Sequence, residues 1–74
     1  MSGLAKRSFS LAGHRTSVAL EDEFWAALGA IAAERGQPVS ALVTQVDAQR
    51  MDGQTLASAL RVLALKNYVP VRSN

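Results

Sequence analysis

The residues of this 74-residue chain that could take part in chemistry are few and lie close together. His14, the only histidine, precedes Ser17 by three positions, which suggests a general base beside a nucleophile. The surrounding residues alternate as in a strand, however, and side chains three positions apart on a strand point to opposite faces. The two side chains therefore cannot meet directly, and no catalytic residue is predicted.

Other patterns that often signal a site have simpler explanations here. The acidic run 21–23 would suit a cation, yet acids at a helix start more commonly complement the positive end of the helix dipole. Phe24 and Trp25 would suit a ligand platform, yet aromatic residues at helical spacing from Leu28 are more commonly core. The chain has no cysteine and no glycine-rich phosphate motif, so neither a metal nor a cofactor is predicted.

The remaining residues with functional potential are basic and hydroxyl groups in an acid-free segment. Residues 1–20 hold Lys6, Arg7 and Arg15 and no Asp or Glu. The sequence pI is about 9.7, although the net charge of +2 is modest. Such a surface suits the phosphates of a nucleic acid. The same residues also suit a solvated strand face that binds nothing.

Two short strands must position these residues. Residues 7–11 and 15–20 each alternate between apolar and polar positions, and Gly13 separates them as a bend or bulge. A strand this short is unstable alone. Its partner is either residues 7–11 folded back or the same strand of a second chain. The alternation of residues 15–20 gives an inward face of Thr16, Val18 and Leu20 and an outward face of Arg15, Ser17 and Ala19.

Three helices are expected to follow the strands. The first begins near Glu21 and ends at Gly36, the second runs from about Pro38 or Val39 to Gln49, and the third is capped by Thr55 and ends near Asn67. We expect one domain at residues 6–68, with a frayed segment at 1–5 and a tail at 69–74.

The bulk composition favours association. A domain of this size buries only about 60% of its unfolded surface. Hydrophobic residues nevertheless make up 49% of the chain, and no disulfide can stabilise it. A symmetric dimer is the simplest way to cover that apolar surface. No apolar run of membrane-spanning length and no secretory signal core is present, so no membrane association and a cytoplasmic location are expected.

Part of the chain resembles a known protein family. The run RTSVALEDEFWAALGAIAAERGQPVSALVTQV, residues 15–46, resembles the ribbon-helix-helix fold of bacterial transcription repressors. An alternating strand enters a helix directly, a glycine ends that helix, and a Ser-Ala-Leu-Val run follows in the second helix. The segments KRSFSLAGHRTSVALEDEFW, GQPVSALV and LASALRVLALKNY extend the similarity to a narrower group of bacterial ribbon-helix-helix proteins, over residues 6–68.

The resemblance implies a mainly α fold with short β. In that family two chains intertwine as a homodimer, their strands pair antiparallel into one intermolecular β-ribbon, and four helices interlock beneath it. This chain would add one C-terminal helix to that plan. The shared dimer core would contain Thr16, Val18, Leu20, Phe24, Leu28, Ile31, Leu42, Val43 and Val46.

The resemblance also implies a function. The family lays its ribbon in the major groove of double-stranded DNA, which is about 12 Å wide. The expected protein is a homodimeric, DNA-binding transcription regulator of the repressor or antitoxin type. Arg15, Ser17 and Ala19 would contact bases, although Ala19 offers only apolar contact. The candidates for phosphate contact are Lys6, Arg7, Val39 and Ser40.

Two alternatives stay open at this point. The first is a dimer of the same fold that binds a protein partner without reading DNA. Ala19 and the low net charge favour it, and Val62 and Leu65 would provide the docking face. The strand at 7–11 and the helix at 55–67 would then either extend the dimer, with a higher oligomer left open, or cover the ribbon and adapt it to a protein partner.

The second alternative is enzymatic. Proteins that resemble this chain sometimes carry the label of an arylsulfate sulfotransferase. That chemistry needs a histidine nucleophile in a sizeable pocket, and His14 in so small a chain argues against it.

Overall fold

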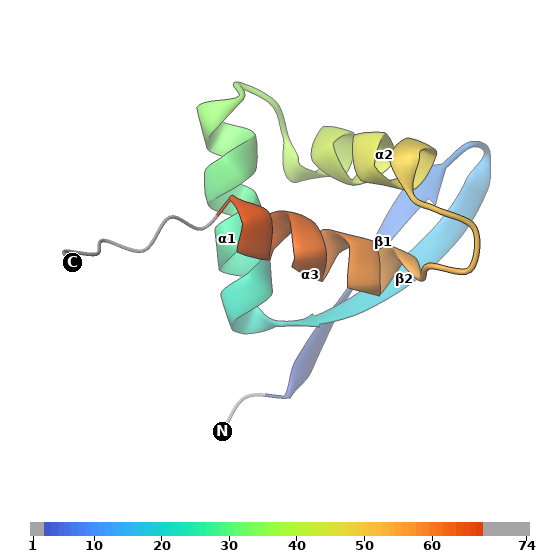
Figure 1. Cartoon of the computed structure of the whole chain (residues 1–74), viewed down its shortest axis with the longest axis horizontal. Helices are drawn as coiled ribbons and strands as arrows, with labels where there is room; N and C mark the ends of the chain where they lie inside the picture. Colours follow the sequence, from blue (N-terminus) through green and yellow to red (C-terminus); the bar gives the residue numbers. More distant parts are fainter. Residues whose placement is uncertain (1–2, 68–74) are drawn as a thin grey trace, which may run out of the picture.

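The computed structural model describes residues 3–67, so the predicted tail at 69–74 lies outside the described residues. The elements in chain order are β1 (Leu4–Leu11), β2 (His14–Glu21), α1 (Asp22–Glu34), α2 (Val39–Gln49) and α3 (Leu56–Lys66). The three helices gather on one side of the two-stranded hairpin (Figure 1). This is the predicted fold class of a ribbon and two helices with one further helix.

β1 and β2 form an antiparallel hairpin within one chain. Leu11 faces His14 next to the turn, and the pairing continues to the open end of the hairpin. Ala12 and Gly13 connect the strands with φ values of 51° and 83°. Two positive φ values are typical of a type I′ turn, whose twist matches that of the paired strands. Gly13 is therefore a tight-turn residue rather than a bulge.

The partner of β2 in this structure is the N-terminal strand of its own chain. The sequence left two partners open, and the resemblance implied a strand from a second chain. β1 pairs with one edge of β2, which realises the first of these alternatives within the chain, and the intermolecular ribbon stays a prediction.

β1 begins earlier than the sequence predicted. Leu4 and Ala5 belong to the strand, although residues 1–5 were expected to be frayed. The buried indole of Trp25 donates a hydrogen bond from Nε1 to the carbonyl oxygen of Ala5 at 2.7 Å. The guanidinium of Arg7 lies over the same ring, 4.8 Å from its centroid. These contacts hold the first half of β1 against α1.

The helix ends follow the local signals in the sequence. α1 follows β2 without a loop and ends in a Schellman motif, in which Gly36 has a φ of 67°. The N–H of Gly36 donates to the carbonyl of Ala33 at 3.1 Å, and the N–H of Gln37 donates to the carbonyl of Ala32 at 3.0 Å. At the start of α3 the hydroxyl of Thr55 accepts a hydrogen bond from a first-turn N–H at 3.0 Å.

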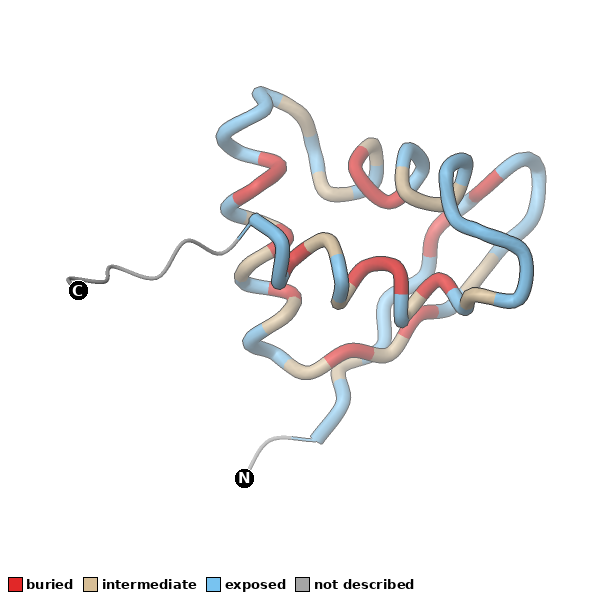
Figure 2. Tube along the Cα trace, in the orientation of Figure 1, coloured by how far each residue is buried: buried red, intermediate tan, exposed pale blue. Residues whose placement is uncertain are grey.

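The core lies between the inward face of the hairpin and the three helices, as the buried segments in Figure 2 show. α3 contributes three buried members of this cluster, Leu56, Leu60 and Ala64. The hairpin and the three helices of one chain therefore form a core together, and the sharing of this core with a second chain stays a prediction. Of the side chains predicted to be core, Val18, Leu20, Leu28, Ile31, Leu42 and Val43 are buried, and Thr16, Phe24 and Val46 are half-buried.

Candidate nucleic-acid interface

The hairpin has an outward face to which both strands contribute. Because side chains alternate along a strand, the register places three facing pairs on this side. We call these six residues the ribbon face. All of them are exposed except Ala19, which is half-buried. The pairs of the ribbon face are Lys6 with Ala19, Ser8 with Ser17, and Ser10 with Arg15.

The polar groups of the ribbon face contact one another across the two strands. The hydroxyl oxygens of Ser8 and Ser17 lie 3.2 Å apart. Arg15 donates from Nη1 to the hydroxyl of Ser10 at 3.4 Å. Hydroxyl groups donate and accept, and a guanidinium carries five donors, so these residues keep capacity for a further ligand. The ribbon face can therefore bind a ligand that offers both acceptors and negative charge.

The charge of the ribbon face is positive. Lys6 and Arg15 stand toward opposite ends of it, and none of its six residues is acidic. The same side of the hairpin continues to Glu21 at the open end, where Arg61 donates from Nε and Nη2 to one carboxylate oxygen at 3.2 and 3.1 Å. A hydrogen bond from its own backbone N–H and those from Arg61 lower the pKa of Glu21. α3 thus neutralises the nearest acid on this side.

The predicted phosphate contacts are not all on the ribbon face. Lys6 lies on it, whereas Arg7 alternates to the inward side and covers Trp25. Val39 and Ser40 belong to α2, which packs on the inward side of the hairpin. The structure therefore brings Lys6 together with the predicted base contacts and places the other three elsewhere.

The start of α2 has its own donors. Pro38 is the N-cap and makes no side-chain capping bond. Its carbonyl accepts hydrogen bonds from the N–H groups of Ala41 at 3.0 Å and Leu42 at 3.3 Å. The first N–H groups of a helix have no acceptor within that helix. The amides of Val39 and Ser40 are therefore the donors that this end of α2 would offer to an anion.

Two residues of the ribbon face were missed at the level of sequence. Ser8 and Ser10 share a side of β1 that the alternation already separated from Phe9 and Leu11. The local sequence pattern does not indicate that this side of β1 lies next to the side of β2 that carries Arg15. Only the strand register shows that these serines extend the same surface.

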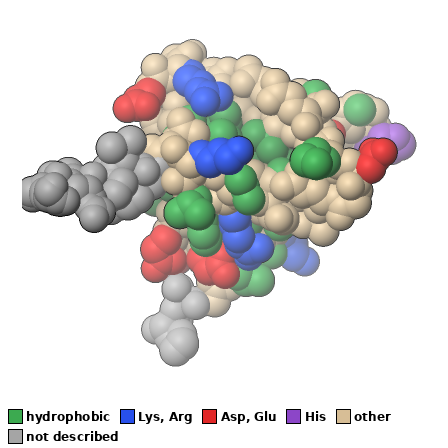
Figure 3. Space-filling model, viewed as in Figure 1, with side chains coloured by type: hydrophobic (Ala, Val, Ile, Leu, Met, Phe, Trp, Pro, Cys, Tyr) green, Lys and Arg blue, Asp and Glu red, His purple; other side chains and the backbone are tan. Residues whose placement is uncertain are grey.

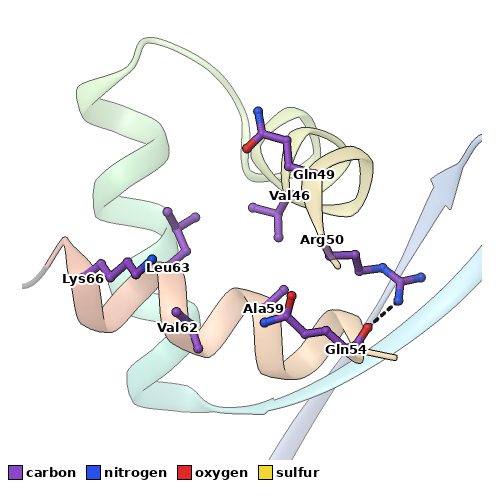
Figure 4. A pocket seen from close by; sticks show the side chains of 8 residues that line it. All are labelled: Val46, Gln49, Arg50, Gln54, Ala59, Val62, Leu63 and Lys66. Carbon is purple, nitrogen blue, oxygen red and sulfur yellow. Dashed lines mark hydrogen bonds between the residues drawn. The ribbon is translucent and has the colours of Figure 1, made fainter. Parts of the chain in front are cut away.

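His14 is exposed beside the hairpin turn, and its side chain lies on the opposite face of β2 from that of Ser17. A surface hollow of about 190 Å³ lies between α2 and α3, where Arg50 donates to the carbonyl of Gln54 at 2.6 Å (Figure 4). Within residues 3–67, no group of three His, Cys, Asp or Glu side chains could hold a metal ion. The hollow is lined by Val46, Gln49, Arg50, Gln54, Ala59, Val62, Leu63 and Lys66.

Comparison with known protein families shows to which family this architecture belongs. The family model of the ribbon-helix-helix domain matches residues 4–68, from the start of β1 to just beyond α3. No curated protein and no solved structure matches the chain. In the described part of the chain, no helix has the length and apolar character needed to cross a membrane. With the ribbon, the directly following helix pair and the family match in agreement, the chain belongs to the ribbon-helix-helix domain family.

Proposed function

We propose that this protein is a DNA-binding transcription regulator that acts as a cytoplasmic homodimer of the repressor or antitoxin type. The family commonly binds DNA in this role. The observation that carries the proposal is the ribbon face, in which two basic and three hydroxyl side chains are exposed on a two-stranded hairpin. A ribbon of this width fits the major groove. The proposed role is binding rather than catalysis.

The side chains divide by the kind of contact they would make. The guanidinium of Arg15 suits a bidentate bond to guanine O6 and N7. The serine hydroxyls suit base edges or phosphates, and Lys6 suits a phosphate. Ala19 offers apolar contact to a thymine methyl. Val39 and Ser40 would add phosphate contacts through their amides. We do not include Arg7, because its guanidinium is engaged over an aromatic ring on the inward side.

The proposal is tested by fluorescence anisotropy with selected and random duplexes over a salt series. Arg15→Ala should weaken binding of the selected duplex by roughly 5- to 150-fold, which corresponds to about 1–3 kcal/mol. Lys6→Ala should lower the slope of log affinity against log salt by about 1. The matched control is Lys66→Ala, which removes the same charge from the end of α3. Absence of binding to any duplex at low salt refutes the proposal.

A second candidate function is a protein-interaction dimer, and the surface of α3 favours it. Leu65 is 70% exposed and Val62 is 39% exposed. Leu65 also lines a shallow hollow of about 170 Å³ with Phe24 and Ala27 of α1. Figure 3 views this helix side and shows hydrophobic side chains gathered between charged ones. An apolar surface bordered by polar residues commonly marks an association site.

The two candidates predict different effects of Arg15→Ala, and the interaction candidate also predicts an effect of Leu65→Glu. Under the interaction candidate, Leu65→Glu lowers the mass measured by sedimentation equilibrium, and Arg15→Ala changes no measured binding. Under the DNA-binding proposal, Arg15→Ala weakens duplex binding while the solution mass of the free protein stays the same.

A further inference from the structure

We propose that the hollow between α2 and α3 is a binding site for a small monocarboxylate whose apolar body has about the size of one ring. The hollow has a volume of about 190 Å³. Both helices lie on the inward side of the hairpin (Figure 1), so the hollow is separate from the ribbon face. The inference therefore does not depend on DNA binding.

The hollow is a trough along the line where the two helices meet. α3 lines it with residues at spacings of three and four, which share one side of a helix. These residues are Ala59, Val62, Leu63 and Lys66. The lining residues of α2 have the same spacing and are Val46, Gln49 and Arg50. At one end Arg50 donates from Nη1 to the carbonyl of Gln54 at 2.6 Å, and Lys66 lies toward the other end (Figure 4).

The middle of the trough is apolar. Val46 and Leu63 are half-buried, Ala59 is buried, and Val62 remains exposed at the rim. An apolar cavity of about 150 Å³ holds a molecule of the size of benzene. The hollow therefore has room for one ring, and a ring bound there removes apolar surface of both helices from water.

The charge of the hollow is positive. Arg50 and Lys66 line it, and no acidic side chain does. Arg50 is already compensated, because it donates from Nε to Oδ1 of Asp47 at 2.8 Å. Residues 3–67 form two ion pairs, and neither of them includes Lys66. One negative charge on a ligand therefore balances the charge that the hollow retains.

The donors in the hollow suit a carboxylate. The ammonium of Lys66 carries three N–H donors, which the oxygens of a carboxylate accept. Arg50 uses one N–H on Asp47 and one on the carbonyl of Gln54, so these two bonds fix the closed end of the trough. A phosphate ester carries up to about two negative charges, which exceeds the charge of one lysine. A monocarboxylate matches both the charge and the apolar floor.

The test is a titration of the nitrogen-15-labelled full chain with phenylacetate at low ionic strength, followed by two-dimensional NMR. Phenylacetate joins one ring to one carboxylate, and phenylacetamide is the matched neutral control. We expect a dissociation constant on the order of 1 mM for phenylacetate. The neutral amide should bind about two- to fivefold more weakly, because it lacks the pairing with an exposed ammonium. The backbone signals that shift should belong to residues 46–54 and 59–66.

Three results of this titration overturn the inference. The first is equal affinity for the acid and the amide, and the second is a set of shifts centred outside the hollow. The third is the absence of any shift, which includes the case in which a second copy of the chain covers the hollow in solution.

Two substitutions of the exposed Lys66 isolate the role of its charge. Lys66→Gln should weaken phenylacetate binding about two- to fivefold, whereas Lys66→Arg keeps the charge and should stay within about twofold of wild type. Thermal unfolding checks that both variants are folded. Unchanged binding in a folded Lys66→Gln variant overturns the inference. Because Lys66 lies outside the ribbon face, duplex binding should stay the same in both variants, so this site and the DNA-binding proposal fail separately.

Discussion

The hairpin turn offers a sharp test of the ribbon as described. Among residues 3–67, Ala12 is the only non-glycine residue with a positive φ. A residue with a Cβ atom in the left-handed region costs about 1–2 kcal/mol. Asparagine tolerates this region, and Asn-Gly is a preferred pair for a type I′ turn. Ala12→Asn changes one exposed side chain and touches neither the core nor the ribbon face.

The expected gain follows from that backbone conformation. Recovery of about half of the left-handed cost stabilises the fold by about 0.5–1 kcal/mol. A change of 1 kcal/mol shifts the Tm of a domain this small by about 4–8 °C, so Ala12→Asn should raise it by about 2–8 °C. The assay is thermal unfolding followed by circular dichroism, with urea unfolding to check that the slope against denaturant is unchanged.

The neighbouring glycine provides the opposite control. Gly13 has a φ of 83°, and a Cβ atom added there would meet no atom within 4 Å. Gly13→Ala therefore tests backbone strain alone and should destabilise the fold by about 1–2 kcal/mol. If Ala12→Asn lowers the Tm or leaves it unchanged while Gly13→Ala is neutral, residues 12 and 13 do not form the turn described. DNA affinity should be the same in both variants, because the turn is not part of the ribbon face.

Two further predictions concern the core and pH. Leu42 is fully buried, so Leu42→Ala should cost about 2–5 kcal/mol in urea unfolding and leave the domain largely unfolded, whereas Leu65→Ala at a 70% exposed site should stay within about 0.5 kcal/mol. Equal losses would contradict the described packing. The hydrogen bond from its own backbone N–H, together with the pairing with Arg61, lowers the pKa of Glu21, so its ionised carboxylate stabilises the fold above the ordinary glutamate pKa, and this contribution is lost as pH falls through the lowered one. Between about pH 7 and about pH 3, the Tm of wild type should fall further than that of Glu21→Gln, and parallel declines would contradict this role.

The sequence by itself determined the elements and their faces, because the signals for these are local. Alternation placed Arg15, Ser17 and Ala19 opposite Thr16, Val18 and Leu20, and it depends only on neighbouring residues. Gly36 ends the first helix because it readily adopts the left-handed conformation that the Schellman motif requires. Thr55 caps the third helix because its hydroxyl reaches a first-turn N–H. The resemblance to the ribbon-helix-helix family rested on the same local order of strand and helices.

The partner of β2 was decided only by the tertiary structure. Alternation states which residues share a face but not which strand lies beside them, and both candidate partners had suitable patterns. Ala12-Gly13 is also a weaker hairpin signal than Asn-Gly, so the local pattern indicates only a bend or bulge at Gly13. The pairing then fixed three features that no local pattern contains: the start of β1 at Leu4, the inward position of Arg7, and the addition of two serines to the ribbon face. Each depends on contacts between residues distant in sequence, because the buried Trp25 of α1 and the register with β2 position β1.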